Sequence, residues 1–333
     1  MPIESELATQ LSSFDPLGVS VELPYRALYF PFGFPAQIET NHPDVIRAAH
    51  RNWSDTGLHF PEQPVLVRVI VSEGGAAGCP PLPVYRAQRS LFSFVADAEN
   101  IAVVDLAGGF ATAWVTEAVL KEVEYFRYCF LLGMAGSMID ARHLVSLHAA
   151  CVALDGQGIL LTGESGAGKS SLAFACATHG FTYVSDDCSA IVRKREGRSV
   201  VGTPGSIRFR ESAGELFPEL RGRKALPSFR RQPSIEVRTA DLPGIRTSFE
   251  ADVDHVVILN RDQKFGDSAE LAPITAGEAR SRLFSEVWPR ELPWTEERSE
   301  AVERVLGGGT YELRYRDLEP AVNRLAQLVR SGL

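Results

Sequence analysis

The sequence contains little cysteine and no cysteine pair. Its five cysteines are spread over 333 residues, and none stands in a C-x-x-C motif. This spacing disfavours both a disulfide framework and a zinc site, because each needs cysteines arranged in a recognisable pattern. We expect most of these thiols to be small buried side chains. They are Cys79, Cys129, Cys151, Cys176 and Cys188.

Long apolar runs and an excess of positive charge are also missing. The longest apolar run, residues 128–139, is shorter than the ~20 residues that a helix needs to cross a bilayer, and it lies between Arg127 and Asp140. The net charge of −8 disfavours nucleic acid and anionic membranes as partners, since both attract clustered Lys and Arg. Residues 1–15 lack a basic segment followed by an apolar core, so we expect a cytoplasmic protein.

The length of the chain suits roughly two domains. Residues 1–116 are typical of a small α+β domain, in which Gly and Pro separate a helix near 41–53 from short strands. Residues 117–142 are predicted to form a connecting helix. Residues 143–333 alternate strands and helices, which predicts an α/β core. The strands expected in the first domain are 65–71, 91–95, 101–105 and 111–116, and the main elements expected in the second are strands 145–154, 158–162, 181–185 and 253–259 and helices 170–178, 276–286 and 318–329.

A phosphate-binding loop follows the apolar strand 159–161. Its residues spell G-E-S-G-A-G-K-S, which fits the P-loop (Walker A) pattern G-x-x-x-x-G-K-[ST]. Glycines allow successive backbone N–H groups to turn toward a phosphate, and the helix that follows adds the positive field of its N-terminus. The residues expected to bind the nucleotide are Gly163, Glu164, Ser165, Gly166, Ala167, Gly168, Lys169, Ser170 and Ser171.

Two residues of this loop have specific tasks in phosphoryl transfer. Lys169 would bind the terminal phosphates, and the Ser170 hydroxyl would bind Mg²⁺. The loop predicts ATP as the nucleotide, although GTP fits the same pattern.

An acidic pair, Asp186 and Asp187, ends the apolar stretch 181–185. We expect this strand to lie beside the strand that leads into the P-loop and to deliver the pair to the phosphates. One carboxylate can then bind Mg²⁺ while the other accepts a proton from an attacking hydroxyl. Such a pair is also common as a turn or helix cap. Its position after a P-loop favours the catalytic interpretation.

A single histidine, His148, stands among apolar residues in the predicted strand 145–154. A histidine in such a place is often a core side chain with satisfied hydrogen bonds. The residues alone leave both the structural and the functional interpretation open.

These three elements together resemble the catalytic domain of HPr kinase/phosphorylase. That family has a strand carrying a histidine, a P-loop of the G-[DE]-S-G-x-G-K-S kind, and a strand ending in an Asp-Asp pair. The resemblance extends over residues 143–333, because 253–259 and 276–288 are similar to a later strand and helix of the family. It implies a P-loop kinase core of the HPr-kinase/PEP-carboxykinase-like type.

The resemblance also implies roles for the site residues. The acidic pair would hold the general base, with Asp186 the first choice, and Asp187 would lie beside the metal. His148 would lie near the reacting groups. Because the family forms hexamers, a homo-oligomer is implied as well.

Two differences separate the sequence from that family. Ser171 stands where the P-loop of the family continues with Glu, and residues 203–210 stand where a signature containing Arg-Gly-Leu-Gly is expected. That signature belongs to the bifunctional enzyme, so the differences argue against phosphorolysis and against HPr as the substrate. The chain is more similar to divergent HPr-kinase-related proteins, some of which phosphorylate other peptides or hydroxyl metabolites.

Residues 208–231 form a basic stretch with several Gly and Pro residues, which predicts a long loop. One of its cations could contact the γ-phosphate and stabilise charge in the transition state. The same loop could instead be a solvated segment, or a lid that closes over substrate. The candidates are Arg208, Arg210, Arg221, Arg223, Lys224, Arg230 and Arg231.

The sequence therefore predicts a Mg·ATP-dependent kinase. Its acceptor would be a hydroxyl group, on a serine of a protein or peptide or on a small metabolite. The alternative is a nucleotide-binding regulatory or scaffold module that transfers no phosphate. A retained acidic pair favours the kinase, because binding alone needs no base.

Overall fold

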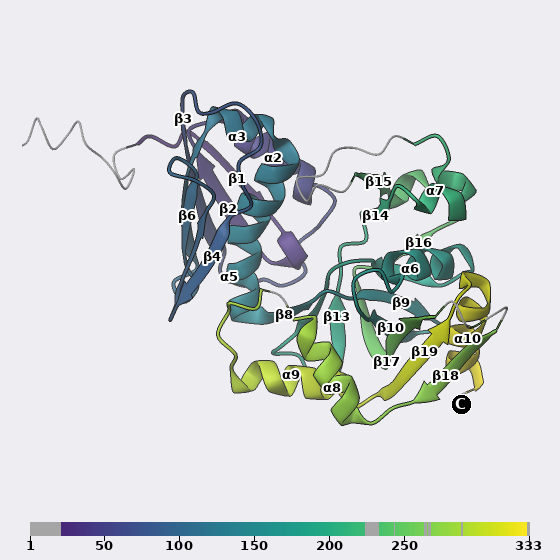
Figure 1. Ribbon diagram of the computed structural model, residues 1–333. Coiled ribbons are helices and arrows are strands. Elements are labelled where there is room, and N and C mark those ends of the chain that lie inside the picture. The colour runs from purple at the N-terminus through teal and green to yellow at the C-terminus, as the bar shows by residue number, and fades with distance from the viewer. Residues whose placement is uncertain are drawn as a thin grey trace, which may run out of the picture. The chain divides into compact units, whose positions relative to one another are not determined.

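The computed structural model describes residues 21–223, 233–242, 244–262, 265, 268–287 and 289–331. The chain divides into two compact units, Met1–Ile139 and Asp140–Leu333, and each contains its own large sheet (Figure 1). The expectation for residues 1–15 lies outside the described residues. Among the helices of the described residues, none combines the length and the apolar content that crossing a membrane requires.

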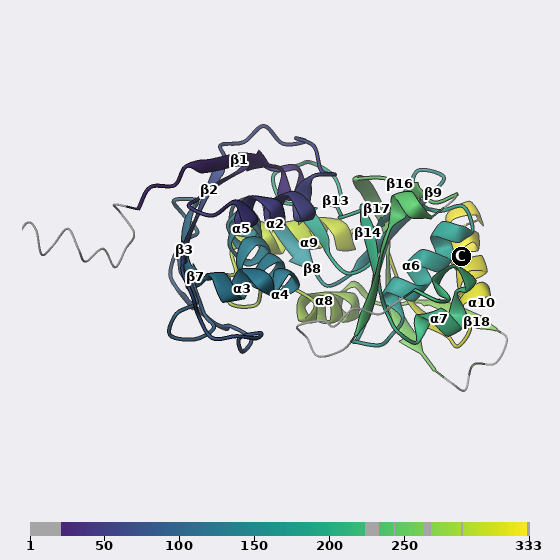
Figure 2. The same ribbon diagram turned by 90° about the horizontal axis from the view of Figure 1, so that it is seen from above.

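The first unit is built on a seven-stranded mixed sheet in the order β1-β2-β3-β7-β6-β5-β4. Side chains alternate between its two faces, so that Phe92 and Phe94 are buried while their neighbours in sequence are not. Helix α2 (Pro43–Trp53) lies on one face of this sheet, together with the helical residues that begin at Glu117 (Figures 1 and 2). The strands are β1 Tyr25–Tyr29, β2 Ala36–Thr40, β3 Val65–Ser72, β4 Val84–Gln88, β5 Leu91–Val95, β6 Ile101–Asp105 and β7 Phe110–Thr116.

The segment predicted to be one helix over 117–142 is broken in the structure. It comprises α3 (Glu117–Lys121), α4 (Val123–Tyr125), a π-helical stretch η2 (Phe126–Leu132) and α5 (Gly133–His143). Glu122 separates the first two helices because its backbone, at φ −84° and ψ 63°, leaves the helical region. The prediction of a single helix was therefore wrong, although the segment is helical over most of its length.

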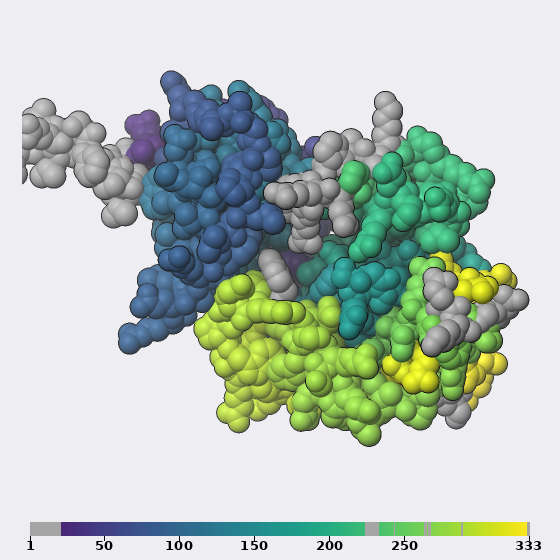
Figure 3. All heavy atoms as spheres, in the orientation of Figure 1, coloured from purple at the N-terminus to yellow at the C-terminus, as the bar shows by residue number. Residues whose placement is uncertain are grey.

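The second unit has a ten-stranded mixed sheet between two layers of helices, which confirms the predicted α/β class. Its main path is β16-β11-β9-β10-β17-β13-β12-β8, and β19 extends it by pairing with both β17 and β18. Figure 2 shows α6 and α10 on one side of β17 and α8 and α9 on the other. The space-filling view shows the yellow-green residues of α8 and α9 as one continuous surface (Figure 3).

The elements of the second unit have the following bounds. Its strands are β8 Leu144–Leu147, β9 Ala150–Leu154, β10 Gln157–Thr162, β11 Thr182–Ser185, β12 Ser189–Val192, β13 Ser199–Val201, β16 Arg246–Thr247, β17 Glu250–Arg261, β18 Ala269–Pro273 and β19 Gly309–Tyr315, and its longer helices are α6 Lys169–Thr178, α8 Ala276–Ser285, α9 Glu296–Leu306 and α10 Leu318–Ser331.

Strand β10 lies inside this unit, and both of its faces are buried. Ile159 and Leu161 pack into the core formed with α6 and α10, whereas Leu160 packs into the core formed with α8 and α9. An uninterrupted apolar run is the pattern expected of a strand covered on both faces. The sheet therefore fixes the strand that leads into the P-loop.

Strand β11, which carries the acidic pair, does not lie beside β10 as the sequence suggested. Strand β9 lies between them and pairs antiparallel with both. Since both neighbours oppose β9, they run in the same direction and end at the same edge of the sheet. The predicted adjacency was wrong, but the pair and the P-loop still follow the ends of strands at a common edge.

The expected strand 145–154 is in fact two strands, β8 and β9, and His148 lies at the break between them. Strand β8 pairs with β12 at one end of the sheet path, whereas β9 pairs with β10 and β11. The chain must therefore leave one strand and enter another at this point. This break takes His148 out of the regular strand in which the sequence had placed it.

Part of the basic stretch is also regular, contrary to the predicted loop. Arg208 and Arg210 lie on β14 (Ser206–Arg210), which pairs antiparallel with β15 (Ser234–Arg238) in a separate two-stranded sheet. Arg221 and Arg223 lie near the end of the short helices α7 (Ala213–Leu216) and η3 (Pro218–Leu220). Lys224, Arg230 and Arg231 lie outside the described residues.

Candidate active site

The P-loop connects the end of β10 to the start of α6. Three of its glycines have positive φ, at 151° for Gly163, 92° for Gly166 and 97° for Gly168. At Gly168 a Cβ atom would lie 2.5 Å from the Tyr315 hydroxyl oxygen, so a side chain there would collide. The Tyr315 hydroxyl in turn donates to the carbonyl oxygen of Ala167 at 2.7 Å. Tyr315 therefore fixes the loop in a shape that requires glycine.

Lys169, the first residue of α6, points back into the loop. Its side chain is largely buried, with 6% of the residue exposed, and its Nζ donates to the carbonyl oxygen of Gly163 at 2.5 Å. Burial lowers the pKa of Lys169, while the carboxylates of Glu286 and Asp187 act to raise it and Arg210 acts to lower it. Charged groups from three other elements are thus close enough to influence this ammonium.

Asp186 is buried and held by two donors. The Tyr183 hydroxyl donates to its Oδ1 at 2.9 Å, and the backbone N–H of Arg208 donates to its Oδ2 at 3.2 Å. Burial, with a smaller contribution from the charge on Asp187, raises the pKa of Asp186 to about 7. The Ser170 hydroxyl lies 3.5 Å from the backbone oxygen of Asp186, so the P-loop helix meets the acidic pair directly.

Asp187 lies nearer the surface and pairs with His148. The His148 Nε2 lies 2.8 Å from Asp187 Oδ1, and its Nδ1 lies 3.1 Å from Glu286 Oε2. The exposed fractions of the side chains rise from 14% for Glu286 to 42% for His148 and 58% for Asp187. The structure thus brings His148 to the acidic pair.

Arg210 reaches the P-loop from β14. Its guanidinium donates to the Ser165 hydroxyl at 3.3 Å. Since the neighbouring Arg208 donates its backbone N–H to Asp186, β14 contacts both the P-loop and the acidic pair. Arg208 itself pairs with Glu236 at 3.0 Å. Arg210 is therefore the arginine of the basic stretch that meets the loop in the described residues.

Most of the residues singled out from the sequence lie at one edge of the second sheet. The loop from Gly163 to Gly168, with Lys169 and Ser170, meets the acidic pair and His148 there, and Ser171 lies one residue further along α6. The sequence analysis missed Tyr183, Glu286 and Tyr315. Only Tyr183 carried a signal, since it stands three residues before Asp186 in the same strand; Glu286 and Tyr315 are distant in sequence.

The polar groups at this edge suit a magnesium nucleotide. Within the described residues, no group of three or more His, Cys, Asp and Glu side chains could hold a metal on its own. Mg²⁺ bound with a nucleotide needs few protein ligands, because phosphate oxygens and waters complete its coordination. The Ser170 hydroxyl and the Asp187 carboxylate could be these few protein ligands.

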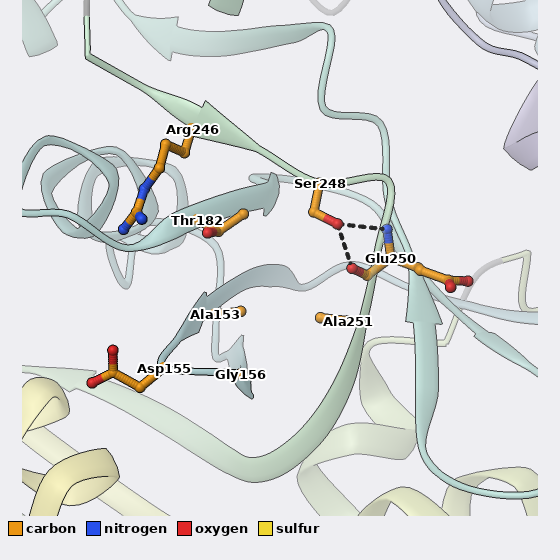
Figure 4. A pocket seen from close by; sticks show the side chains of 8 residues that line it. All are labelled: Ala153, Asp155, Gly156, Thr182, Arg246, Ser248, Glu250 and Ala251. Carbon is orange, nitrogen blue, oxygen red and sulfur yellow. Dashed lines mark hydrogen bonds between the residues drawn. The ribbon is translucent and has the colours of Figure 1, made fainter.

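Two clefts lie at the other end of β10, away from the P-loop. Both include Asp155 and Gly156, which form the β9–β10 turn, and their volumes are about 350 and 520 Å³. In the first cleft the Ser248 hydroxyl is bonded to the Glu250 main chain, and the Asp155 and Arg246 side chains stand apart (Figure 4). These two clefts therefore do not coincide with the charged residues of the P-loop edge.

Comparison with known proteins identifies relatives over part of this unit. Residues 141–210 match the family model described as the HPr Serine kinase C-terminal domain. The HPr kinase/phosphorylase of Lactobacillus delbrueckii subsp. bulgaricus is 46% identical over 57 residues, which are 17% of this chain and 18% of that protein. The HPr kinase/phosphorylase of Chlorobaculum tepidum is 30% identical over 92 residues, 27% of each chain. The matches thus span only about a fifth to a quarter of these curated relatives.

A solved structure, the Hpr(Ser) kinase/phosphatase from Coxiella burnetii, is also similar. It aligns with a TM-score of 0.28 and 17% sequence identity, covering 56% of this chain and 93% of that chain. The P-loop, the acidic pair and His148 all lie within residues 141–210, the range that the family model matches.

Proposed function

We propose that this chain, whose residues 141–210 match the HPr Serine kinase C-terminal domain, is an HPr-kinase-related Mg·ATP-dependent kinase that phosphorylates a hydroxyl group. The observation that carries the proposal is the contact between the P-loop helix and the acidic pair, where the Ser170 hydroxyl lies 3.5 Å from the Asp186 backbone oxygen. A nucleotide in the loop would have its terminal phosphate directed to these carboxylates. That juxtaposition is what phosphoryl transfer requires.

Nucleotide binding is assigned to the loop and to Lys169. The positive-φ glycines allow backbone N–H groups to converge on phosphate oxygens, and the start of α6 contributes its dipole. The Lys169 ammonium, which donates to the Gly163 carbonyl, can exchange that oxygen for a phosphate oxygen within the same turn. Ser170 and Asp187 would hold Mg²⁺, which neutralises charge on the phosphates when bound.

Proton acceptance is assigned to the acidic pair. A pKa of about 7 suits Asp186 to this task, because a general base works best when its pKa is close to the working pH. Its low exposure, 5% of the residue, means that the acceptor hydroxyl must approach closely. The greater exposure of Asp187 favours the reverse assignment, in which Asp187 takes the proton. Variants of the two residues distinguish these assignments.

The acceptor is proposed to be a seryl hydroxyl of a peptide or protein, or a small alcohol. Transfer of label from Mg·[γ-³²P]ATP to an array of serine peptides and a panel of hydroxyl metabolites tests this. We expect the wild-type chain to label one class of acceptor. Lys169→Ala should abolish labelling and weaken ATP binding by about 100-fold or more, since it removes the charged donor to the phosphates.

Lys194→Ala is the matched control, because Lys194 is exposed on a turn that follows β12. It should leave both ATP binding and labelling unchanged. If the chain binds ATP but Asp186→Asn and Asp187→Asn leave every ATP-dependent activity unchanged, the kinase proposal fails. A nucleotide-binding regulatory module would then be the better description.

A further inference from the structure

We propose that Glu286 is a positioning residue that orients His148 toward Asp187 for phosphoryl transfer. This inference rests on the proposed kinase function. Glu286 follows α8 and is more than 130 residues from His148 in sequence, so the fold alone brings them together.

The backbone joins the two residues before their side chains meet. The His148 N–H donates to the Glu286 carbonyl oxygen at 2.8 Å, and the neighbouring residues Leu147 and Val287 form an antiparallel bridge. The start of α8 is fixed separately by a capping box between Thr275 and Glu278. Glu286 is therefore delivered to His148 by a helix with a defined start and a paired end.

The side chains then hold the imidazole ring in one orientation. Glu286 Oε2 lies 3.1 Å from Nδ1 and Asp187 Oδ1 lies 2.8 Å from Nε2. A half-turn of the ring would replace both nitrogens by carbons and break both contacts. A carboxylate on one ring nitrogen commonly fixes which way the other nitrogen points. Here the other nitrogen points at Asp187.

A surface ion pair without a role is the main alternative. Exposed pairs contribute little to stability, and His148 and Asp187 are both substantially exposed. Glu286 differs, because its side chain is 14% exposed and a carboxylate in such surroundings needs a partner. Its charge also acts on Lys169, at the nucleotide end of the site. Glu286 is thus held inside the group of charges that surrounds the P-loop.

Kinetics of paired variants test the inference with the acceptor identified by the labelling screen. Glu286→Ala should lower kcat about 10-fold and change KM for ATP less than about 3-fold, because a residue that orients a reacting group acts on the chemical step. Glu286→Gln should retain most activity, since its amide oxygen can still accept from Nδ1–H. In the His148→Ala background, Glu286→Ala should add less than about a 2-fold loss.

Ser281→Ala, at an exposed position of the same helix, is the control and should keep wild-type kcat. A merely structural role predicts a different result: Glu286→Ala and Glu286→Gln would be equally impaired, and the loss would add fully to that of His148→Ala. Either observation would overturn the inference.

The ¹⁵N–¹H spectrum of the histidine rings gives a second readout that needs no turnover. The His148 ring signals, identified by their absence from His148→Ala, should move in Glu286→Ala and stay close to wild type in Glu286→Gln. Unchanged His148 signals in Glu286→Ala would contradict the inference even in an active enzyme. A wild-type chain that transfers no phosphate contradicts the proposed function instead, and the spectrum alone then decides whether Glu286 orients His148.

Discussion

The two ends of strand β10 differ in how they hold charged side chains. At its start lie the two clefts, where charged side chains form ion pairs such as Arg198–Asp254 at 2.7 Å and Arg330–Asp155 at 3.5 Å. At its end lies the P-loop, where the buried Lys169 and Asp186 stand close to the more exposed pair His148 and Asp187.

Buried charge distinguishes the P-loop end of β10, whereas these two clefts lie at the other end. At the start of β10 the Arg330–Asp155 pair is exposed and the Arg198–Asp254 pair is only half-buried, so these charges keep much of their contact with water. Burying Lys169 and Asp186 costs free energy, because burial disfavours a charged group. Burial therefore lowers the pKa of Lys169 and raises the pKa of Asp186, which favours the neutral form of each. Strongly perturbed ionisable groups gather at functional sites, which supports the P-loop end as the place of chemistry.

The largest expected effect concerns the acidic pair. If Asp186 is the base, Asp186→Asn should lower kcat/KM by about 10² to 10⁴-fold. In the wild type, kcat/KM should rise with pH through about 7, since the raised pKa of Asp186 keeps it protonated below that value. Asp187→Asn should move this rise to lower pH, because it removes a negative charge that raises the pKa of Asp186.

The position of the rise on the pH axis is the readout for this prediction, because kcat/KM follows the ionisation of the enzyme before Mg·ATP binds. If Asp187 were the base, Asp187→Asn would instead remove the pH-dependent activity and Asp186→Asn would keep part of it. Asp155→Asn, at the other end of β10, should leave the profile unchanged.

A smaller effect concerns stability. Between about pH 4 and pH 7 the unfolded chain has released the Asp186 proton while the folded protein retains it, so the free energy of unfolding falls as pH rises. Asp186→Asn removes the ionisable group, so the free energy of unfolding no longer falls with pH for this reason. Relative to wild type, the variant should gain roughly 2–3 kcal/mol between pH 5 and pH 8. Urea unfolding at the two pH values measures the gain.

The exposed Asp155 again supplies the control, because its side chain is 62% exposed. Asp155→Asn should show no such gain. An Asp186→Asn variant whose stability relative to wild type is the same at both pH values would mean that the buried carboxyl is ionised throughout.

The smallest effect concerns Arg210, which contacts Ser165 of the P-loop. Arg210→Ala should raise KM for ATP about 5- to 10-fold with little change in kcat, since a guanidinium at the loop adds to phosphate binding but not to proton transfer. Arg223→Ala is the matched variant from the same basic stretch, where Arg223 bonds to the Glu219 carbonyl. Equal KM values for the two variants would exclude a particular role for Arg210.

Much of this site follows from local sequence, and the rest does not. The P-loop is contiguous, and its glycines, Lys169 and Ser170 are recognisable because each has a local task in the turn. Asp186 and Asp187 could be connected to it because strands of an α/β sheet end at a common edge. The intervening β9 could not be foreseen, since pairing partners depend on the whole sheet.

Local sequence patterns also could not predict contacts between residues that are far apart in the chain. Glu286 and Tyr315 reach the site from α8 and β19, and nothing near them in sequence marks them as partners of His148 and Ala167. The break between β8 and β9 was hidden for a related reason. Residues 144–154 are almost uniformly apolar, and such a run does not reveal where one strand ends and the next begins.

The proposed function depends most on where a nucleotide binds. A crystal structure with Mg²⁺ and a non-hydrolysable ATP analogue measures this directly. We expect the triphosphate inside the loop of residues 163–168, with its terminal phosphorus facing Asp186 and Asp187. A nucleotide bound instead in the clefts around Asp155, or in the loop with its terminal phosphate turned away from both carboxylates, would contradict the proposed function.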